Sequence, residues 1–233
     1  FRPSAGAHHD APATPGDLLF HIRASQQDVC FELELQIARR LDGAATIVDE
    51  VQGFKYFDER DLLGFVDGTE NPVGEDARAA VTIDDGSPHQ GGSYVIVQKY
   101  LHDLSAWNGL PVAEQELIIG RSKLDNIELA DEIKPSNSHV ALNTIEDAAG
   151  AELAILRDNM PFGSPARGEF GTYYIAYAAD PAVIERMLAN MFIGDPPGNY
   201  DRILDFSTPL TGNLFYVPTA SFLEDLPAAP ALA

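Results

Sequence analysis

The sequence predicts an α+β fold with two ferredoxin-like (split βαβ) domains, the N-terminal one incomplete in this chain. Two patterns support this prediction. The second half follows the order β-α-β-β-α-β, which defines the split βαβ motif, whereas the first half shows only β-α-β. Either the first domain is a different small fold or the chain lacks an N-terminal segment, and the absence of an initiator Met favours the second explanation. We expect residues 1–91 to form the partial domain and residues 92–233 the complete one.

The first half begins with residues 1–16, whose Pro, Ala and Gly predict a loose, extended lead-in. Residues 17–24, DLLFHIRA, form a short apolar run typical of a strand. An acidic capping pattern predicts a helix over 25–41. The β-branched and aromatic residues of 45–57 then predict a strand or bent hairpin. A loop rich in Gly and Asp is expected over 73–92.

The second half supplies the remaining strands and helices of the motif. The helical segment 104–120 is interrupted by Gly109 and Pro111. The other helix covers 180–192, with Asp180 as its N-cap. The predicted strands cover 91–101, 170–180 and 212–219, and residues 151–163 are predicted to form a strand that runs into a loop.

Composition excludes several classes of function. A formal net charge of −21 argues against nucleic acid as a partner, because binding phosphates requires clustered Lys and Arg. No apolar run approaches the roughly 20 residues of a membrane span, and no secretory signal is visible, so we expect a cytoplasmic protein without a membrane partner. A single cysteine, Cys30, excludes an internal disulfide framework and a cysteine-based zinc site.

One stretch, LLGFVDGTENPVG at 62–74, places a carboxylate beside a glycine after an apolar run. A calcium loop fails here, because Pro72 and Arg78 stand where that loop needs glycine and glutamate. No dinucleotide-binding motif, phosphate loop or hydrolase elbow occurs elsewhere. From these residues alone, Asp67 is either part of a structural turn or a functional carboxylate, and both interpretations stay open.

Two further stretches carry polar residues of types that act in catalysis or ligand binding. In KPSNSHVAL, His139 follows a polar loop and precedes an apolar, strand-like segment. In ILRDNMPFG, Arg157 and Asn159 end a predicted strand and face the same way by its period of two. Together they can stabilise an anion or a polarised oxygen. For each residue, a purely structural role is also consistent with the sequence.

Taken together, these stretches resemble the dye-decolorising peroxidases, haem proteins built from two ferredoxin-like domains. GFVDGTENP matches the family's G-x-x-D-G signature, and the similarity runs through IIGRSKLDNIEL, KPSNSHVALN, ILRDNMPFG, GEFGTYYIAYA and DRILDFSTPLTGNLFYVP, over residues 13–223. The sequence is most similar to the bacterial subgroup that includes mycobacterial-type members packaged in encapsulin shells. The resemblance implies a haem b cofactor and reduction of H₂O₂ through a ferryl intermediate, with organic donors such as dyes and phenolics being oxidised.

The resemblance also implies residue roles. His139 matches the proximal ligand of the haem iron. Asp67 matches the distal carboxylate, which acts as acid and base toward peroxide. Arg157 matches the distal arginine, and Asn159 a distal asparagine of this subgroup.

Further cofactor contacts follow from the same resemblance. Asp201 is expected to hydrogen-bond the second nitrogen of the proximal histidine, and is preferred to Asp205. Arg121 is a candidate for the haem propionates or the access channel. Gly68 and Thr69 are expected at the haem, where glycine allows close approach of the backbone.

The implied partners are H₂O₂, an organic electron donor and further copies of the chain in a homo-oligomer. An encapsulin shell is a further implied partner, which would place the protein in the cytoplasm inside a nanocompartment, although no docking tail follows the C-terminal Pro/Ala segment. Two alternatives remain: a haem-handling protein that binds haem or releases its iron, and a non-catalytic ferredoxin-like binding module.

Overall fold

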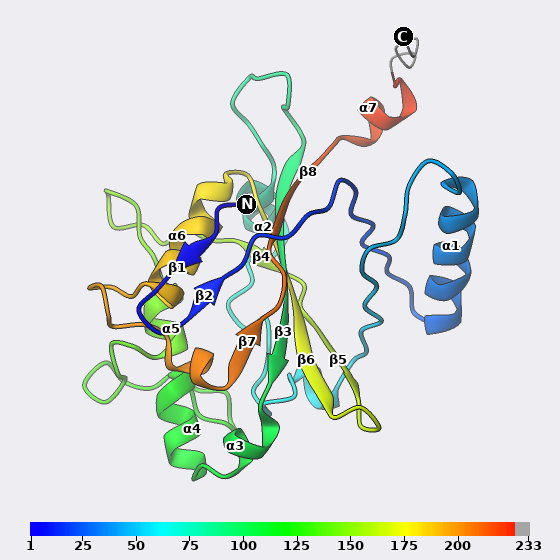
Figure 1. Ribbon diagram of the computed structural model, residues 1–233. Coiled ribbons are helices and arrows are strands. Elements are labelled where there is room, and N and C mark those ends of the chain that lie inside the picture. The colour runs from blue at the N-terminus through cyan, green and yellow to red at the C-terminus, as the bar shows by residue number, and fades with distance from the viewer. Residues whose placement is uncertain (227–233) are drawn as a thin grey trace. The chain divides into compact units, whose positions relative to one another are not determined.

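The structure is a computed structural model that describes residues 1–226 and contains two compact units (Figure 1). One unit combines Phe1–Thr14 with the chain from Gly53 onward, and the other is Pro15–Gln52. The expected domain division between residues 91 and 92 stays a prediction.

The larger unit is built on a six-stranded antiparallel sheet with the order β4-β6-β3-β7, in which β5 also pairs with β6 and β8 with β3. The long strands β3 and β6 form its centre, in a register that runs from Tyr94 opposite Ala178 to Leu101 opposite Gly171. The strands are β3 (Ser93–His102), β4 (Leu156–Arg157), β5 (Met160–Ser164), β6 (Glu169–Ala178), β7 (Ser207–Pro209) and β8 (Asn213–Val217). A separate two-stranded sheet pairs β1 (Ser4–Ala5) with β2 (Asp10–Ala11). The α+β class is confirmed, and the order β8-β3-β6 with β4 and β5 agrees with a ferredoxin-like sheet.

Helices of this unit follow the local signals in the sequence. The predicted break at Gly109 and Pro111 separates α3 (Leu104–Asn108) from α4 (Val112–Ile119). The Asp180 carboxylate caps α6 (Pro181–Phe192) by accepting a bond from the Ala182 N–H at 2.9 Å. Helix α6 packs its buried side chains with those of β3 and β6 in the main core. Those side chains are Ile184, Met187, Leu188, Met191 and Phe192.

Several local predictions for this unit are wrong. The segment after His139 is not strand-like, because the Ser138 hydroxyl accepts a bond from the Ala141 N–H and begins helix α5 (His139–Asn143). The expected loop at 73–92 contains helix α2 (Gly74–Val81), which has two acidic residues in its first turn. In place of the one strand and loop predicted over 151–163, the chain forms two short strands, β4 and β5. Strand β7 was not predicted, and the remaining short helices are η1 (Phe57–Glu59), η2 (Arg202–Asp205) and α7 (Ala220–Glu224).

The smaller unit contains the predicted helix as α1 (Gln27–Arg40), whose N-cap is Gln26. The strands predicted over 17–24 and 45–57 are not formed. An apolar run becomes a strand only where another strand pairs with it, and none of the described strands pairs with these residues. Several of their apolar side chains are exposed instead, such as Leu18 (62%) and Val48 (77%). Of all the described helices, none combines the length and apolar content required to cross a bilayer.

Candidate functional site

A single pocket in the larger unit brings together His139, Asp67 and Arg157, which are far apart in sequence. They come from the start of α5, the loop before α2 and strand β4, respectively. The pocket opens to solvent, and its empty space is about 730 Å³ when the open mouth is included. Its apolar lining consists of Val66, Ile119, Val140, Leu153, Ala154, Ile155 and Met187. The predicted residues Gly68, Thr69 and Arg121 also line it.

The histidine of this pocket is anchored by a buried carboxylate. His139 Nδ1 lies 2.7 Å from Asp201 Oδ2, and Asp201 is completely buried. The other oxygen of Asp201 accepts a bond from the Ile203 N–H at 3.0 Å. Because an ionised carboxylate only accepts hydrogen bonds, this geometry places the proton on Nδ1. Nε2 has no hydrogen-bond partner among the described residues and is therefore available as a ligand.

The two candidate carboxylates, Asp201 and Asp205, differ in their contacts. Asp205 Oδ1 lies 3.0 Å from the Tyr200 hydroxyl and 3.2 Å from His9 Nε2, and it has no contact with His139. Asn143, which the sequence did not single out, donates to the His139 carbonyl at 2.7 Å and lies 3.3 Å from Nδ1. Asn143 therefore stabilises the turn of α5 that carries His139.

Asp67 is oriented by Asn159. The amide nitrogen of Asn159 lies 3.2 Å from Oδ1 and 3.0 Å from Oδ2 of Asp67, so it donates to both carboxylate oxygens. The side-chain oxygen Oδ1 of Asn159 accepts a bond from the Ile175 N–H of β6 at 3.1 Å, which fixes the orientation of the side-chain amide. The carboxylate is thus held toward the pocket by a side chain that is itself tied to the sheet.

Arg157 enters the pocket from β4. Its main-chain N–H and C=O both bind the side-chain amide of Asn71, at 2.9 and 2.7 Å. Its Nε is buried without a hydrogen-bond partner in the described part of the chain. An unpaired buried donor on a cation is costly, and such groups often mark a place where a ligand binds. Asn71 lies within the stretch 62–74, but nothing in the spacing of that stretch predicts its contact with Arg157.

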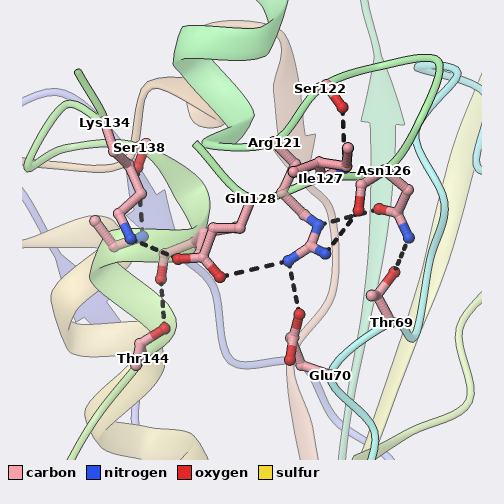
Figure 2. A network of polar contacts seen from close by, with 12 residues as sticks. Thr69, Glu70, Arg121, Ser122, Asn126, Ile127, Glu128, Lys134, Ser138 and Thr144 are labelled. Atoms are coloured by element: carbon pink, nitrogen blue, oxygen red, sulfur yellow. Dashed lines mark hydrogen bonds and ion pairs between the residues drawn. The ribbon is translucent and has the colours of Figure 1, made fainter. Parts of the chain in front are cut away.

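Arg121 belongs to a polar network at one side of the pocket (Figure 2). Its Nη1 donates to Glu70 at 2.6 Å and lies 3.6 Å from a carboxylate oxygen of Glu128. Its Nε and Nη2 donate to the side chain and carbonyl of Asn126 at 3.0 and 2.9 Å. Asn126 also donates to the Thr69 hydroxyl at 2.8 Å. The guanidinium is therefore bound on all sides by protein groups, and the network connects the Asp67 loop with residues 121–128.

Two partly buried ionisable groups lie close enough to Asp67 to interact with it. Burial raises the pKa of Asp61 to about 7, and the nearby Asp67 charge adds to the shift, while backbone N–H groups oppose it. Burial also raises the pKa of Tyr174, with Arg157 opposing and Asp67 reinforcing the shift. No local pattern in the sequence indicates either pKa shift, because both shifts depend on tertiary burial.

The residues of the pocket restrict the kind of metal that could bind there. No group of three or more His, Cys, Asp or Glu side chains in residues 1–226 could hold a metal ion. One free imidazole nitrogen in a pocket with an apolar lining instead suits a metal that brings its own equatorial ligands.

Comparisons with known proteins agree with this geometry. The family model described as "Dyp-type peroxidase, C-terminal" matches residues 58–222, and "Dyp-type peroxidase, N-terminal" matches residues 1–55. The chain belongs to the Dyp-type peroxidase family. The resemblance in the sequence is thereby confirmed.

Relatives within the Dyp-type peroxidase family are close in sequence and structure. A dye-decolorizing peroxidase of Rhodococcus erythropolis is 63% identical over 226 residues, covering 97% of this chain and 66% of the relative. DyPB of Rhodococcus jostii is 63% identical with a TM-score of 0.95, covering 97% of this chain and 73% of that chain. An encapsulated DyP-type peroxidase of Mycobacterium smegmatis is 63% identical with a TM-score of 0.96, covering 99% and 75%. The chain therefore spans about two thirds of the length of the curated R. erythropolis relative.

Proposed function

We propose that this protein is a haem-dependent peroxidase that reduces H₂O₂ and oxidises organic donors such as dyes and phenolics. The observation that carries the proposal is the single pocket that combines His139, anchored through Nδ1 by buried Asp201, with Asp67 and Arg157. Relatives named dye-decolorizing peroxidase support the reaction class, and a structure of a Rhodococcus jostii DypB variant in complex with heme supports the cofactor.

Haem b fits the residues of the pocket. His139 offers one unbonded imidazole nitrogen, and the apolar lining suits a flat macrocycle. Gly68 has φ +72°, which permits a close backbone approach at the lining. The unpartnered Nε of Arg157 matches an anionic or polarised ligand at the same place. Haem, when bound, supplies the redox-active iron at which peroxide is reduced.

The residues of the chain then handle protons and charge. Asp67 accepts the proton of H₂O₂ at a carboxylate oxygen and returns it to the departing oxygen, so that water leaves. Asn159 holds that carboxylate in one orientation through bonds to both of its oxygens. Arg157 stabilises the negative charge that develops on the departing oxygen.

His139 would hold the iron of a bound haem through Nε2, the imidazole nitrogen that has no partner among the described residues. Its Nδ1 proton is shared with Asp201, which makes the imidazole a more electron-rich ligand. Complete burial of Asp201 strengthens this interaction, since water does not compete for the carboxylate.

We also propose that the protein is a homo-oligomer packaged inside an encapsulin shell. The support is its similarity to the encapsulated peroxidase of M. smegmatis. Co-expression with a shell protein, followed by size-exclusion chromatography and electron microscopy of the purified shells, tests the packaging.

A stopped-flow peroxide titration of haem-loaded protein tests the peroxidase proposal. We expect Asp67→Ala and Arg157→Ala to retain haem, judged by the Soret band, but to react with H₂O₂ roughly 10²- to 10⁴-fold more slowly. His139→Ala should lose the iron ligation. If wild type bound haem but barely reacted with peroxide, a haem-handling role would be favoured. If no Soret band developed, the chain would be a binding module without haem.

A further inference from the structure

We propose that Asn71 is a positioning residue that fixes Arg157 relative to Asp67; this inference deepens the proposed function and rests on it. Asn71 Nδ2 donates to the Arg157 carbonyl at 2.7 Å, and the Arg157 N–H donates to Asn71 Oδ1 at 2.9 Å. One side-chain amide therefore pairs with both main-chain groups of a residue that lies 86 positions away. It binds Arg157 in the way that a neighbouring strand would.

This pairing compensates for the shortness of β4, which has only two residues, Leu156 and Arg157. On one edge β4 pairs with β6, where Arg157 lies opposite Ala176, and the adjacent Asp158 N–H donates to the Ile175 carbonyl at 2.9 Å. The main-chain N–H and C=O of Arg157 both pair with the side chain of Asn71. Without Asn71, two partly buried main-chain groups would lose their partners, and the strand end would be held on one side only.

Asp67 directly precedes the turn that carries Asn71. The Asn71 N–H donates to the Gly68 carbonyl at 3.1 Å and closes a tight turn. Gly68 has φ +72°, and a Cβ at this position would lie 3.0 Å from Asn71 Nδ2. A side chain there would strain the turn and press on the amide. Gly68 therefore allows the turn that places the side chain of Asn71 beside the main chain of Arg157.

The other end of the same turn is held by Asn159. Asp67 is bound by the Asn159 amide, and Asn159 follows Arg157 by two residues. The segments 67–71 and 157–159 thus form a closed ring that is bonded at both ends. Asp67 and Arg157 belong to opposite segments of this ring, so the ring determines the position of Asp67 relative to Arg157.

The guanidinium of Arg157 depends on this ring for its place. Its Nε is buried and has no hydrogen-bond partner among the described residues, so no bond at Nε corrects a shift of the main chain. A displacement at Cα is carried through to the pocket. Because catalytic geometry tolerates little misplacement, Asn71 acts on the reaction through Arg157 and Asp67 without touching substrate.

Two measurements on haem-loaded protein test this role. In Asn71→Ala we expect the bimolecular rate constant with H₂O₂ to fall about 10- to 100-fold. Fluoride, a small anion that accepts hydrogen bonds, should bind about tenfold more weakly, as followed by visible absorbance. Asn213→Ala is the matched control, because Asn213 also makes two side-chain bonds to one distant residue, Thr14, but does not line the pocket. It should change neither quantity.

Asn71→Asp separates positioning from a general loss of structure. An ionised aspartate keeps the acceptor for the Arg157 N–H but places a second acceptor against the Arg157 carbonyl. Protonation restores the missing donor. We expect the ratio of variant to wild-type rate constants to rise severalfold as the pH falls from about 8 to about 5.

The outcomes separate this inference from the proposed function. If wild type neither reacts with H₂O₂ nor binds fluoride, the proposed function fails. If wild type does both and Arg157→Ala loses both, but Asn71→Ala and Asn71→Asp stay within twofold of wild type at every pH, the role of Asn71 is overturned. A loss in Asn71→Ala with a pH-dependent recovery in Asn71→Asp supports it.

Discussion

The carboxylate of Asp201 lies 2.7 Å from Nδ1 of His139, across 62 residues of sequence, and it is completely buried. Because the carboxylate is shielded from water, its charge acts strongly on the imidazole. The second nitrogen of His139 has no bond to the protein among residues 1–226. The pair therefore has the geometry of a ligand and its supporting acceptor.

Asp201→Asn is expected to weaken haem retention about 10- to 100-fold and to raise the reduction potential of the bound haem. An amide keeps the shape but removes the negative charge that makes the imidazole electron-rich. Haem transfer to apomyoglobin and a spectroelectrochemical titration measure the two effects. Asp205→Asn is the control, because its carboxylate binds Tyr200 and His9 instead. Equal effects of the two substitutions would contradict the assignment.

His102 should make the fold less stable in mild acid. Its ring nitrogens lie 2.8 Å from the Ser207 hydroxyl and 2.9 Å from the Thr172 hydroxyl, and burial lowers its pKa to about 4. The unfolded chain binds the proton near pH 6.5, so His102 costs no stability above that pH. The cost grows as the pH falls toward 4, to about 3 kcal/mol.

Urea unfolding at several pH values measures this effect. The difference between wild type and His102→Gln isolates it, because the variant cannot titrate at this position. A difference in unfolding free energy that stays constant between about pH 7 and about pH 4 would show that His102 does not contribute.

Asp61 should make the fold less stable as the pH rises, over a pH range that overlaps the one in which His102 acts. Burial raises its pKa to about 7, whereas in the unfolded chain it titrates near 3.9. The folded state therefore favours the protonated acid, and stability decreases as the pH rises from about 4 to about 7. Asp61→Asn keeps an acceptor for the Phe65 N–H, which bonds Asp61 Oδ1 at 3.0 Å. Relative to wild type, the variant should gain up to about 4 kcal/mol across that range, as measured by urea unfolding. A variant whose relative stability does not change with pH would contradict the prediction.

Trp107 should contribute to stability and not to the oxidation of donors. Its side chain is completely buried, its indole N–H donates to the Leu63 carbonyl at 2.8 Å, and its ring packs edge-on against Phe65 and Phe206. Trp107→Phe leaves that carbonyl unpaired and should cost about 1–3 kcal/mol of unfolding free energy. Steady-state oxidation of a bulky dye should be unchanged below the unfolding transition. Loss of dye oxidation at full stability would instead indicate an electron relay.

Local sequence signals predicted the elements whose stability is local. The Asp180 cap with Pro181 marks the start of α6, and Gly109 with Pro111 separates α3 from α4, as expected from their backbone preferences. The signature around Asp67, together with His139, Arg157 and the other matching stretches, was enough to recognise the family. Such information resides in residue types and spacings that any reader of the chain can see.

Other features required the tertiary structure. The apolar runs at 17–24 and 45–57 do not form strands, because strand formation depends on a pairing edge and not on the run itself. The preference for Asp201 over Asp205 came from resemblance, since both carboxylates lie in the same short stretch; burial and a 2.7 Å contact distinguish them.

Residue types and their spacing were sufficient to predict the fold class, the family and a set of candidate side chains around Asp67 and His139. The folded structure was needed to show that Asp201 pairs with the histidine, that Asn71 binds Arg157, and that Asp61 lies partly buried near Asp67. Helix caps and turns depend on atoms a few residues apart, so the local sequence contains them. Contacts across 62 or 86 residues depend on the register of a sheet and on the exclusion of water, and these arise only when the chain has folded.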